Sequence, residues 1–238
     1  MPPFQININI DSTGVKQIND NAQYITFVKN VTSNPLSTGN LQVAWLAFSP
    51  FKLNQVSWTQ DYSIYATTTQ IQAGAQIVMT SQTDAFAQLG PIYQFAQGIF
   101  TTGPQGSANT FNTQNNWGTS LTFGLAQQAT VNGAAVMAPL NAVRIGNAQQ
   151  GSFTPIETIS LYLSSFSNNG TVISQVAGTA LTVQLTTQQP VANLGFNNGN
   201  NSFFLVNQTT AANALSITSV ALGDMPSTST ANASRQLS

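Results

Sequence analysis

The chain has 238 residues, yet only five are Lys or Arg and six are Asp or Glu, so 5% of it is charged, against about 25% in an ordinary soluble protein. It contains no His and no Cys, which excludes Ser-His-Asp and Cys-His catalytic sites, Cys/His zinc sites, haem ligation through His and iron–sulfur clusters on Cys. The carboxylates are dispersed along the sequence: Asp11, Asp20, Asp61, Asp84, Glu157 and Asp224. The sequence therefore predicts a protein that is not an enzyme and that holds no metal or cofactor.

The basic residues are also few and scattered. They are Lys16, Lys29, Lys52, Arg144 and Arg235, and the formal net charge is -1 with a pI near 4.9. Nucleic-acid binding takes most of its affinity from several Lys or Arg side chains that neutralise phosphates. Binding to anionic membranes through a polybasic segment has the same requirement. We therefore expect no nucleic-acid partner.

The sequence has no stretch of about 20 apolar residues, so we expect no membrane-spanning helix. Its first ten residues, Met-Pro-Pro-Phe-Gln-Ile-Asn-Ile-Asn-Ile, lack the basic region and the continuous apolar region of a signal peptide. The expectation is a protein that stays inside the cell, leaves it by a non-standard route, or is represented by an already processed chain.

Period-two alternation of apolar and polar residues is the strongest local signal. The first example is Gln5–Ile10, where three Ile alternate with Gln and Asn, and Leu121–Leu125, Thr179–Thr187 and Leu215–Thr218 follow it. Such alternation is typical of half-buried strands. Further β-rich runs are 24–31, 42–48, 56–65, 76–80, 92–100, 142–145, 156–163, 171–176 and 202–207.

Closely spaced strands with little helical periodicity indicate an all-β protein, either an antiparallel β-sandwich or a jelly roll with little helix. Ser81–Gln88 is the one segment that we allow as a short helix, with Asp84 in its first turn, and Gly103–Gly118 is expected to be a long polar loop. We expect a single all-β domain over residues 1–225. Pro226–Ser238 is then a polar tail that packs only where a neighbour orders it.

The densest polar-aromatic cluster lies in the run from residue 56 to 65, and its candidate ligand-binding residues are Trp58, Asp61, Tyr62 and Tyr65. Alternation along a strand puts Asp61 between two hydroxyl-bearing neighbours, on the face opposite to Trp58. Sugars are commonly held by such a group, because an aromatic ring packs on the apolar face of the sugar while carboxylates and amides hydrogen-bond its hydroxyls. The alternative is that the rings belong to the core and that Asp61 bonds backbone at a strand end.

A second candidate ligand-binding group is Asn115, Asn116 and Trp117, inside the expected long loop. Loops run over the surface, and a Trp among amides makes a good contact surface there. The alternative is that Trp117 closes one end of the sandwich. In Phe203-Phe204, consecutive strand residues point to opposite faces, so one ring is expected to face solvent or a partner.

Three classes of function remain compatible with these observations. The first is a non-catalytic, lectin-like protein that binds a glycan or another neutral cell-surface ligand through aromatic rings and amides. The second is a self-assembling capsid, fibre or crystal subunit, because low net charge removes the repulsion that keeps proteins apart. The third is a β-pore-forming toxin, since Thr179–Thr187 has the pattern of an inserting strand. We expect a homo-oligomer in any of these classes.

Overall fold

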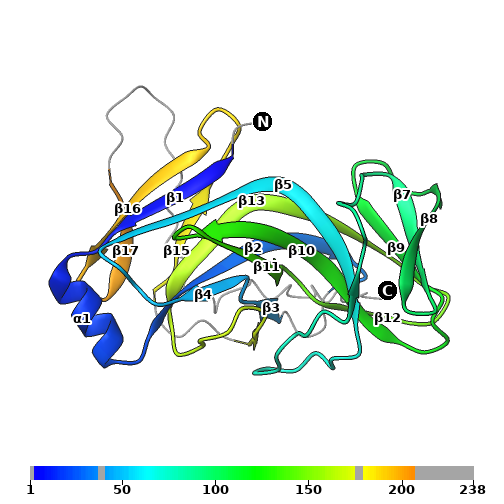
Figure 1. Cartoon of the computed structure of the whole chain (residues 1–238), viewed down its shortest axis with the longest axis horizontal. Helices are drawn as coiled ribbons and strands as arrows, with labels where there is room; N and C mark the ends of the chain where they lie inside the picture. The colour runs from blue at the N-terminus through cyan, green and yellow to red at the C-terminus, as the bar shows by residue number, and fades with distance from the viewer. Residues whose placement is uncertain (1–2, 37–40, 175–178, 207–238) are drawn as a thin grey trace, which may run out of the picture.

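The computed structural model describes residues 3–36, 41–174 and 179–206. Two large sheets run along the length of an elongated molecule, with one helix at one end and a group of short strands at the other (Figure 1). The expected strand at Leu215–Thr218 and the expected tail at Pro226–Ser238 lie outside the described residues.

The first sheet contains eight strands. Across its width these are β11 (Ala134–Pro139), β10 (Leu121–Val131), β5 (Leu53–Thr67), β1 (Phe4–Asn9), β16 (Val191–Asn197) and β17 (Ser202–Leu205), with β12 (Val143–Ile145) paired to β10 and β6 (Ser81–Gln82) paired to β5.

The second sheet contains seven strands. These are β4 (Leu46–Phe48), β2 (Tyr24–Asn34), β13 (Gln150–Ser164), β9 (Phe111–Asn115), β7 (Pro91–Ala96) and β8 (Ile99–Gln105), with β15 (Leu181–Gln184) paired to β13. A small separate pair joins β3 (Gln42–Val43) to β14 (Val172–Ile173). The expected all-β, sandwich-like class is confirmed. The sheets are mixed rather than purely antiparallel, because β1 pairs with β16 and β7 with β9 in parallel.

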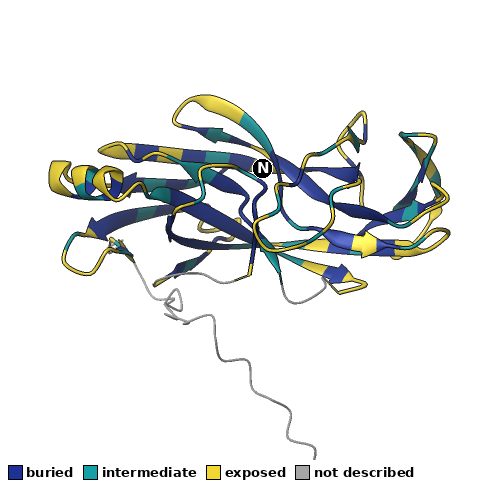
Figure 2. Ribbon diagram, turned by 90° about the horizontal axis from the view of Figure 1, so that it is seen from below, coloured by how far each residue is buried: buried dark blue, intermediate teal, exposed yellow. Residues whose placement is uncertain are grey.

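The alternating runs behave as their pattern predicts. Ile6, Ile8 and Ile10 are all buried, and so are Leu181, Val183 and Leu185 around β15. One hydrophobic cluster joins the inner faces of both sheets, and exposed residues gather in the turns and on the helix (Figure 2). Burial of one face of each strand is what fixes its register, because a one-residue slip would turn every apolar side chain to solvent.

The expected helix at Ser81–Gln88 is wrong. That segment starts as β6 and continues in bends, and the helix of the described chain is instead α1 (Ser12–Asp20). The Asp11 carboxylate caps α1 by accepting a hydrogen bond from the Gly14 N–H at 2.7 Å. This cap satisfies one of the backbone donors that a helix start leaves without a partner.

The expected loop at Gly103–Gly118 is also wrong in its middle. Strand β8 continues to Gln105, and β9 lies between β7 and β13 in the second sheet. Phe111 anchors β9 in the core, while the buried Asn112 amide donates to the backbone carbonyls of Gly90 and Ser107. The run at 76–80 forms no strand, and Gln76 makes a single bridge to Thr171.

Candidate functional site

A bulge in β5 creates the most distinctive surface feature of the first sheet. Tyr62 lies opposite Gln127 on β10, but Trp58 lies opposite Ala129, so residues 59–61 of β5 face a single residue of β10. Bulges of this kind bend a strand and redirect its side chains. Thr59 and Asp61 are therefore exposed on the outside of the sheet, whereas Trp58 and Tyr62 are buried on the inside.

A cavity of about 420 Å³ opens over this bulge. Its lining residues are Pro3, Ser57, Trp58, Thr59, Asp61, Phe86, Gln128, Ala129 and Thr130. Asp61 is the one charged residue among them, and its carboxylate accepts a hydrogen bond of 2.6 Å from the Thr59 hydroxyl. The Phe86 ring is 43% exposed. The cavity thus combines a carboxylate, hydroxyls, an amide and an accessible aromatic ring, and we call it the Asp61 pocket.

Behind the Asp61 pocket lies a buried ion pair. The Lys29 ammonium donates to both carboxylate oxygens of Glu157, at 2.7 and 2.8 Å, and to the Gln127 side-chain oxygen at 2.9 Å. The Lys29 side chain is fully buried and that of Glu157 is 10% exposed. The ammonium also lies between 5.2 and 5.6 Å from the ring centres of Trp45, Trp58 and Tyr62, within the range of cation–π attraction.

A second bulge brings Glu157 to this position. Pro155 of β13 lies opposite Val31 of β2, but Ile159 lies opposite Lys29, so residues 156–158 face a single residue of β2. The Glu157 carboxylate then accepts hydrogen bonds from the Trp58 indole N–H at 2.9 Å and from the Tyr62 hydroxyl at 2.8 Å.

The environment keeps both members of the pair charged near neutral pH. Burial lowers the pKa of Lys29 to about 8, although the charge of Glu157 acts in the opposite direction. Burial by itself would raise the pKa of Glu157, but Lys29 and the two hydrogen bonds from aromatic side chains hold it below its usual value.

Side chains that bind the ion pair also hydrogen-bond the β5 bulge that lines the Asp61 pocket. Gln127, which accepts from Lys29, donates from its amide nitrogen to the Thr59 carbonyl at 2.5 Å. Gln60, in the middle of the bulge, donates to Glu157 at 3.3 Å. The bulge that presents Asp61 to solvent is thus hydrogen-bonded at Thr59 to Gln127 and at Gln60 to Glu157.

The structure separates the first group of predicted site residues. Asp61 is exposed in the pocket, whereas Trp58, Tyr62 and Tyr65 are only 3%, 3% and 0% exposed. Tyr65 lies farther along β5, where its hydroxyl donates to the Asn141 carbonyl. The rings of Trp58 and Tyr62 lie in the core between the sheets, and that of Tyr65 lies in a separate buried cluster with Val43 and Val172, so the accessible ring of the pocket belongs to Phe86.

The second predicted group lies at the end of the molecule that carries β7, β8 and β9. Asn115 is buried and donates to the Thr119 and Ile145 carbonyls, so it shapes the turn rather than facing solvent. Asn116 is exposed, and Trp117 is 45% exposed while it packs on Phe95 with ring centres 5.7 Å apart. This group does not take part in the Asp61 pocket.

Sequence reasoning missed several of these residues. The pocket also contains Phe86, Gln128 and Thr130, which come from segments distant in sequence from β5. No local sequence pattern predicts that these segments meet. Lys29 did carry a signal, because it is the single charge inside the β-rich run at 24–31. In a chain with so few charges, a Lys within an apolar strand requires a partner.

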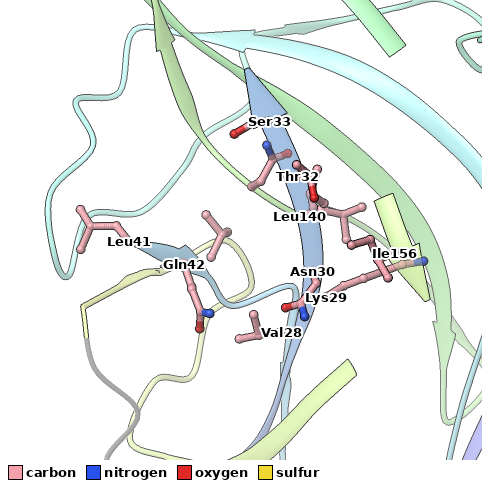
Figure 3. Close-up of a pocket in the computed structure, with 12 residues that line it drawn as sticks. Val28, Lys29, Asn30, Thr32, Ser33, Leu41, Gln42, Leu140 and Ile156 are labelled. Carbon is pink, nitrogen blue, oxygen red and sulfur yellow. The ribbon is translucent and has the colours of Figure 1, made fainter. Parts of the chain in front are cut away.

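Another cavity, of about 270 Å³, lies on the opposite side of β2. Val28, Asn30 and Gln42 lie on this side of β2, while the Lys29 side chain runs the other way (Figure 3). This cavity collects none of the predicted site residues.

Within the described ranges, no group of three or more Asp, Glu, His or Cys side chains lies close enough to hold a metal ion. None of the helical residues described forms a segment long and apolar enough to cross a membrane. Comparisons of the chain with protein families, with curated proteins and with solved structures find no match.

Proposed function

We propose that this protein is a non-catalytic glycan-binding protein and that the Asp61 pocket is its binding site. The observation that carries the proposal is the composition of that pocket: one carboxylate, several hydroxyls, an amide and the Phe86 ring converge on one cavity. A sugar offers hydroxyls that both donate and accept hydrogen bonds, and C–H faces that pack on an aromatic ring. The hydrogen-bonded bulge beneath the pocket favours binding, because a preorganised site loses little freedom when its ligand arrives.

Hydrolysis of a glycosidic bond requires two carboxyl groups on either side of that bond. Asp61 is the one carboxylate that lines the pocket. Glu157 lies nearby, but Lys29 and the Trp58 and Tyr62 hydrogen bonds occupy its oxygens. A carboxylate engaged in this way is a poor general acid, which supports binding without catalysis.

A glycan array followed by titration of the best ligand tests the proposal. We expect D61N and F86A each to weaken binding by about five- to thirtyfold, since each loses a contact in the order of 1–2 kcal/mol. Matched controls are D20N, an exposed acid on α1, and F204A, which removes a ring that is 47% exposed on β17. Equal binding by all four variants, or no array signal at all, would refute the proposed site.

Self-association is a second candidate function, and β8 is the observation that favours it. This strand ends the second sheet, carries no charged residue and exposes Ile99 at 60%. An uncharged edge strand offers unpaired backbone groups to a second chain. Pore formation remains a prediction that no observation favours, because β15 is paired to β13 with its apolar face in the core.

A further inference from the structure

A larger cavity, of about 640 Å³, lies on the same outer face of the first sheet. Its lining residues are Asn7, Ile8, Asn9, Leu53, Asn54, Gln55, Asn132, Gly133, Asn193, Leu194 and Val206. None of them is charged, and six of them are Asn or Gln. We call this cavity the amide groove.

The amides of the groove are aligned across three neighbouring strands. In the register of the sheet, Asn7 of β1 has Gln55 of β5 on one side and Asn193 of β16 on the other. The Asn7 amide nitrogen donates to the Asn193 side-chain oxygen at 2.9 Å, and Gln5 donates to the Asn7 oxygen at 2.7 Å. These bonds orient the row and leave the exposed Gln55 side chain directed to solvent.

The amide groove and the Asp61 pocket are successive parts of one strand face. Leu53 and Gln55 line the groove, and Ser57, Thr59 and Asp61 line the pocket. Alternate residues of a strand share a face, at about 3.3 Å of rise per residue. The face therefore extends for roughly 25 Å along β5, which is much longer than one or two sugar rings. Figure 1 shows β5 running over a large part of the length of the molecule.

We infer that the amide groove and the Asp61 pocket form one continuous binding face for a linear, uncharged polysaccharide whose chain follows β5. This inference rests on the proposed glycan-binding function and specifies its ligand class. The absence of cationic lining residues disfavours anionic sugars, since such a ligand would lose hydration without gaining a charge partner. The row of Gln55, Asn7 and Asn193 lies across the width of the groove, where it offers donors and acceptors to the hydroxyls of a sugar that occupies it. Leu53 and Val206 supply apolar walls.

The test compares disaccharides with hexasaccharides of neutral cello-, chito-, laminari- and manno-oligosaccharides by calorimetric titration on the full chain. For the class that binds, we expect the hexasaccharide to bind at least tenfold more tightly than the disaccharide. The double variant N9A/Q55A changes two exposed residues of the groove and should abolish this gain while disaccharide affinity stays unchanged. D61N should weaken both ligands, because each occupies the Asp61 pocket.

The outcomes distinguish the inference from the proposed function. If N9A/Q55A binds the hexasaccharide as tightly as the unmodified chain does, or if hexasaccharide and disaccharide bind equally, the continuous face is refuted while glycan binding at Asp61 stands. If no oligosaccharide binds, the proposed function fails and the inference fails with it. If N9A/Q55A instead changes the sedimentation coefficient, with no effect on sugar affinity, the groove contacts a second copy and the inference is overturned.

Discussion

Lys29 and Glu157 are buried together in a chain that has very few charged residues. Removing a carboxylate and an ammonium from water costs several kcal/mol each, and their attraction offsets this only when hydrogen bonds satisfy both groups. Here Gln127 and the Trp58 and Tyr62 side chains provide those bonds. The pair joins β2 and β13 of one sheet to β5 and β10 of the other, and the same contacts support the bulge that presents Asp61.

We expect E157Q to lower the free energy of unfolding by about 3–5 kcal/mol at neutral pH, because it leaves the Lys29 charge buried without a counter-ion. The pKa of Glu157 lies lower in the folded chain than its ordinary value of 4.5, so the stabilisation by its charge is complete above pH 4.5 and is lost as the pH falls through the folded pKa. Urea unfolding across this range should therefore show the curves of the unmodified chain and of E157Q converging in acid.

The matched control is D20N, which removes the exposed partner of Lys16 on α1. Exposed pairs contribute little, so D20N should stay within about 0.5 kcal/mol of the unmodified chain at neutral pH. A difference between E157Q and the unmodified chain that remains constant down to pH 3 would contradict the assignment of the ionised pair.

At the scale of elements, the strands were predictable where one face is buried. Alternation identified β1 and β15 because their apolar residues occupy every second position. Helix α1 was missed because its nine residues include Gly14 and Asn19, which favour helix weakly. Strand β9 was missed because its buried amides bond backbone carbonyls, and a polar composition resembles that of a loop.

The Asp11 carboxylate connects α1 to the first sheet by hydrogen bonds, so its removal should lower the stability of the folded chain. Its carboxylate accepts from the Gly14 N–H and from the Asn198 side chain in the turn between β16 and β17. We expect D11A to lower the urea concentration at the midpoint of unfolding, because the N-terminus of α1 loses its cap. D20A, at the other end of the same helix, should have a much smaller effect in the same urea titration. Equal effects would show that the cap contributes nothing specific.

The candidate site was predictable in part. Asp61 among hydroxyls was recognisable, since its neighbours in sequence are also its neighbours on the strand. The bulge was not recognisable, because it arises from the mismatch between β5 and β10 rather than from either strand alone. Alternation alone puts Trp58 and Tyr62 on one face, but it does not tell which face is buried, and the accessible ring, Phe86, comes from a different segment.

At the scale of the whole molecule, the small number of charged residues leaves little charge repulsion to keep the sheet edges of two chains apart. Native edge strands are commonly blunted by Lys, Pro or a covering segment. Strand β8 carries Pro104 near its end, but Ile99 and Phe100 at its start are uncharged, and no described strand pairs with its outer edge. Trp117 and Ile99 both present apolar surface at this end of the molecule.

We therefore expect sedimentation velocity to reveal species larger than the 25.2 kDa monomer, and I99K to shift the population toward the monomer. L89K, which adds the same charge at a side chain 53% exposed outside the strands, should leave the distribution unchanged. Association should respond little to salt, because few ion pairs are available to screen. A monomer at every concentration, or dissociation by moderate salt alone, would exclude the β8 edge as the contact, since neither result is compatible with pairing of uncharged backbone.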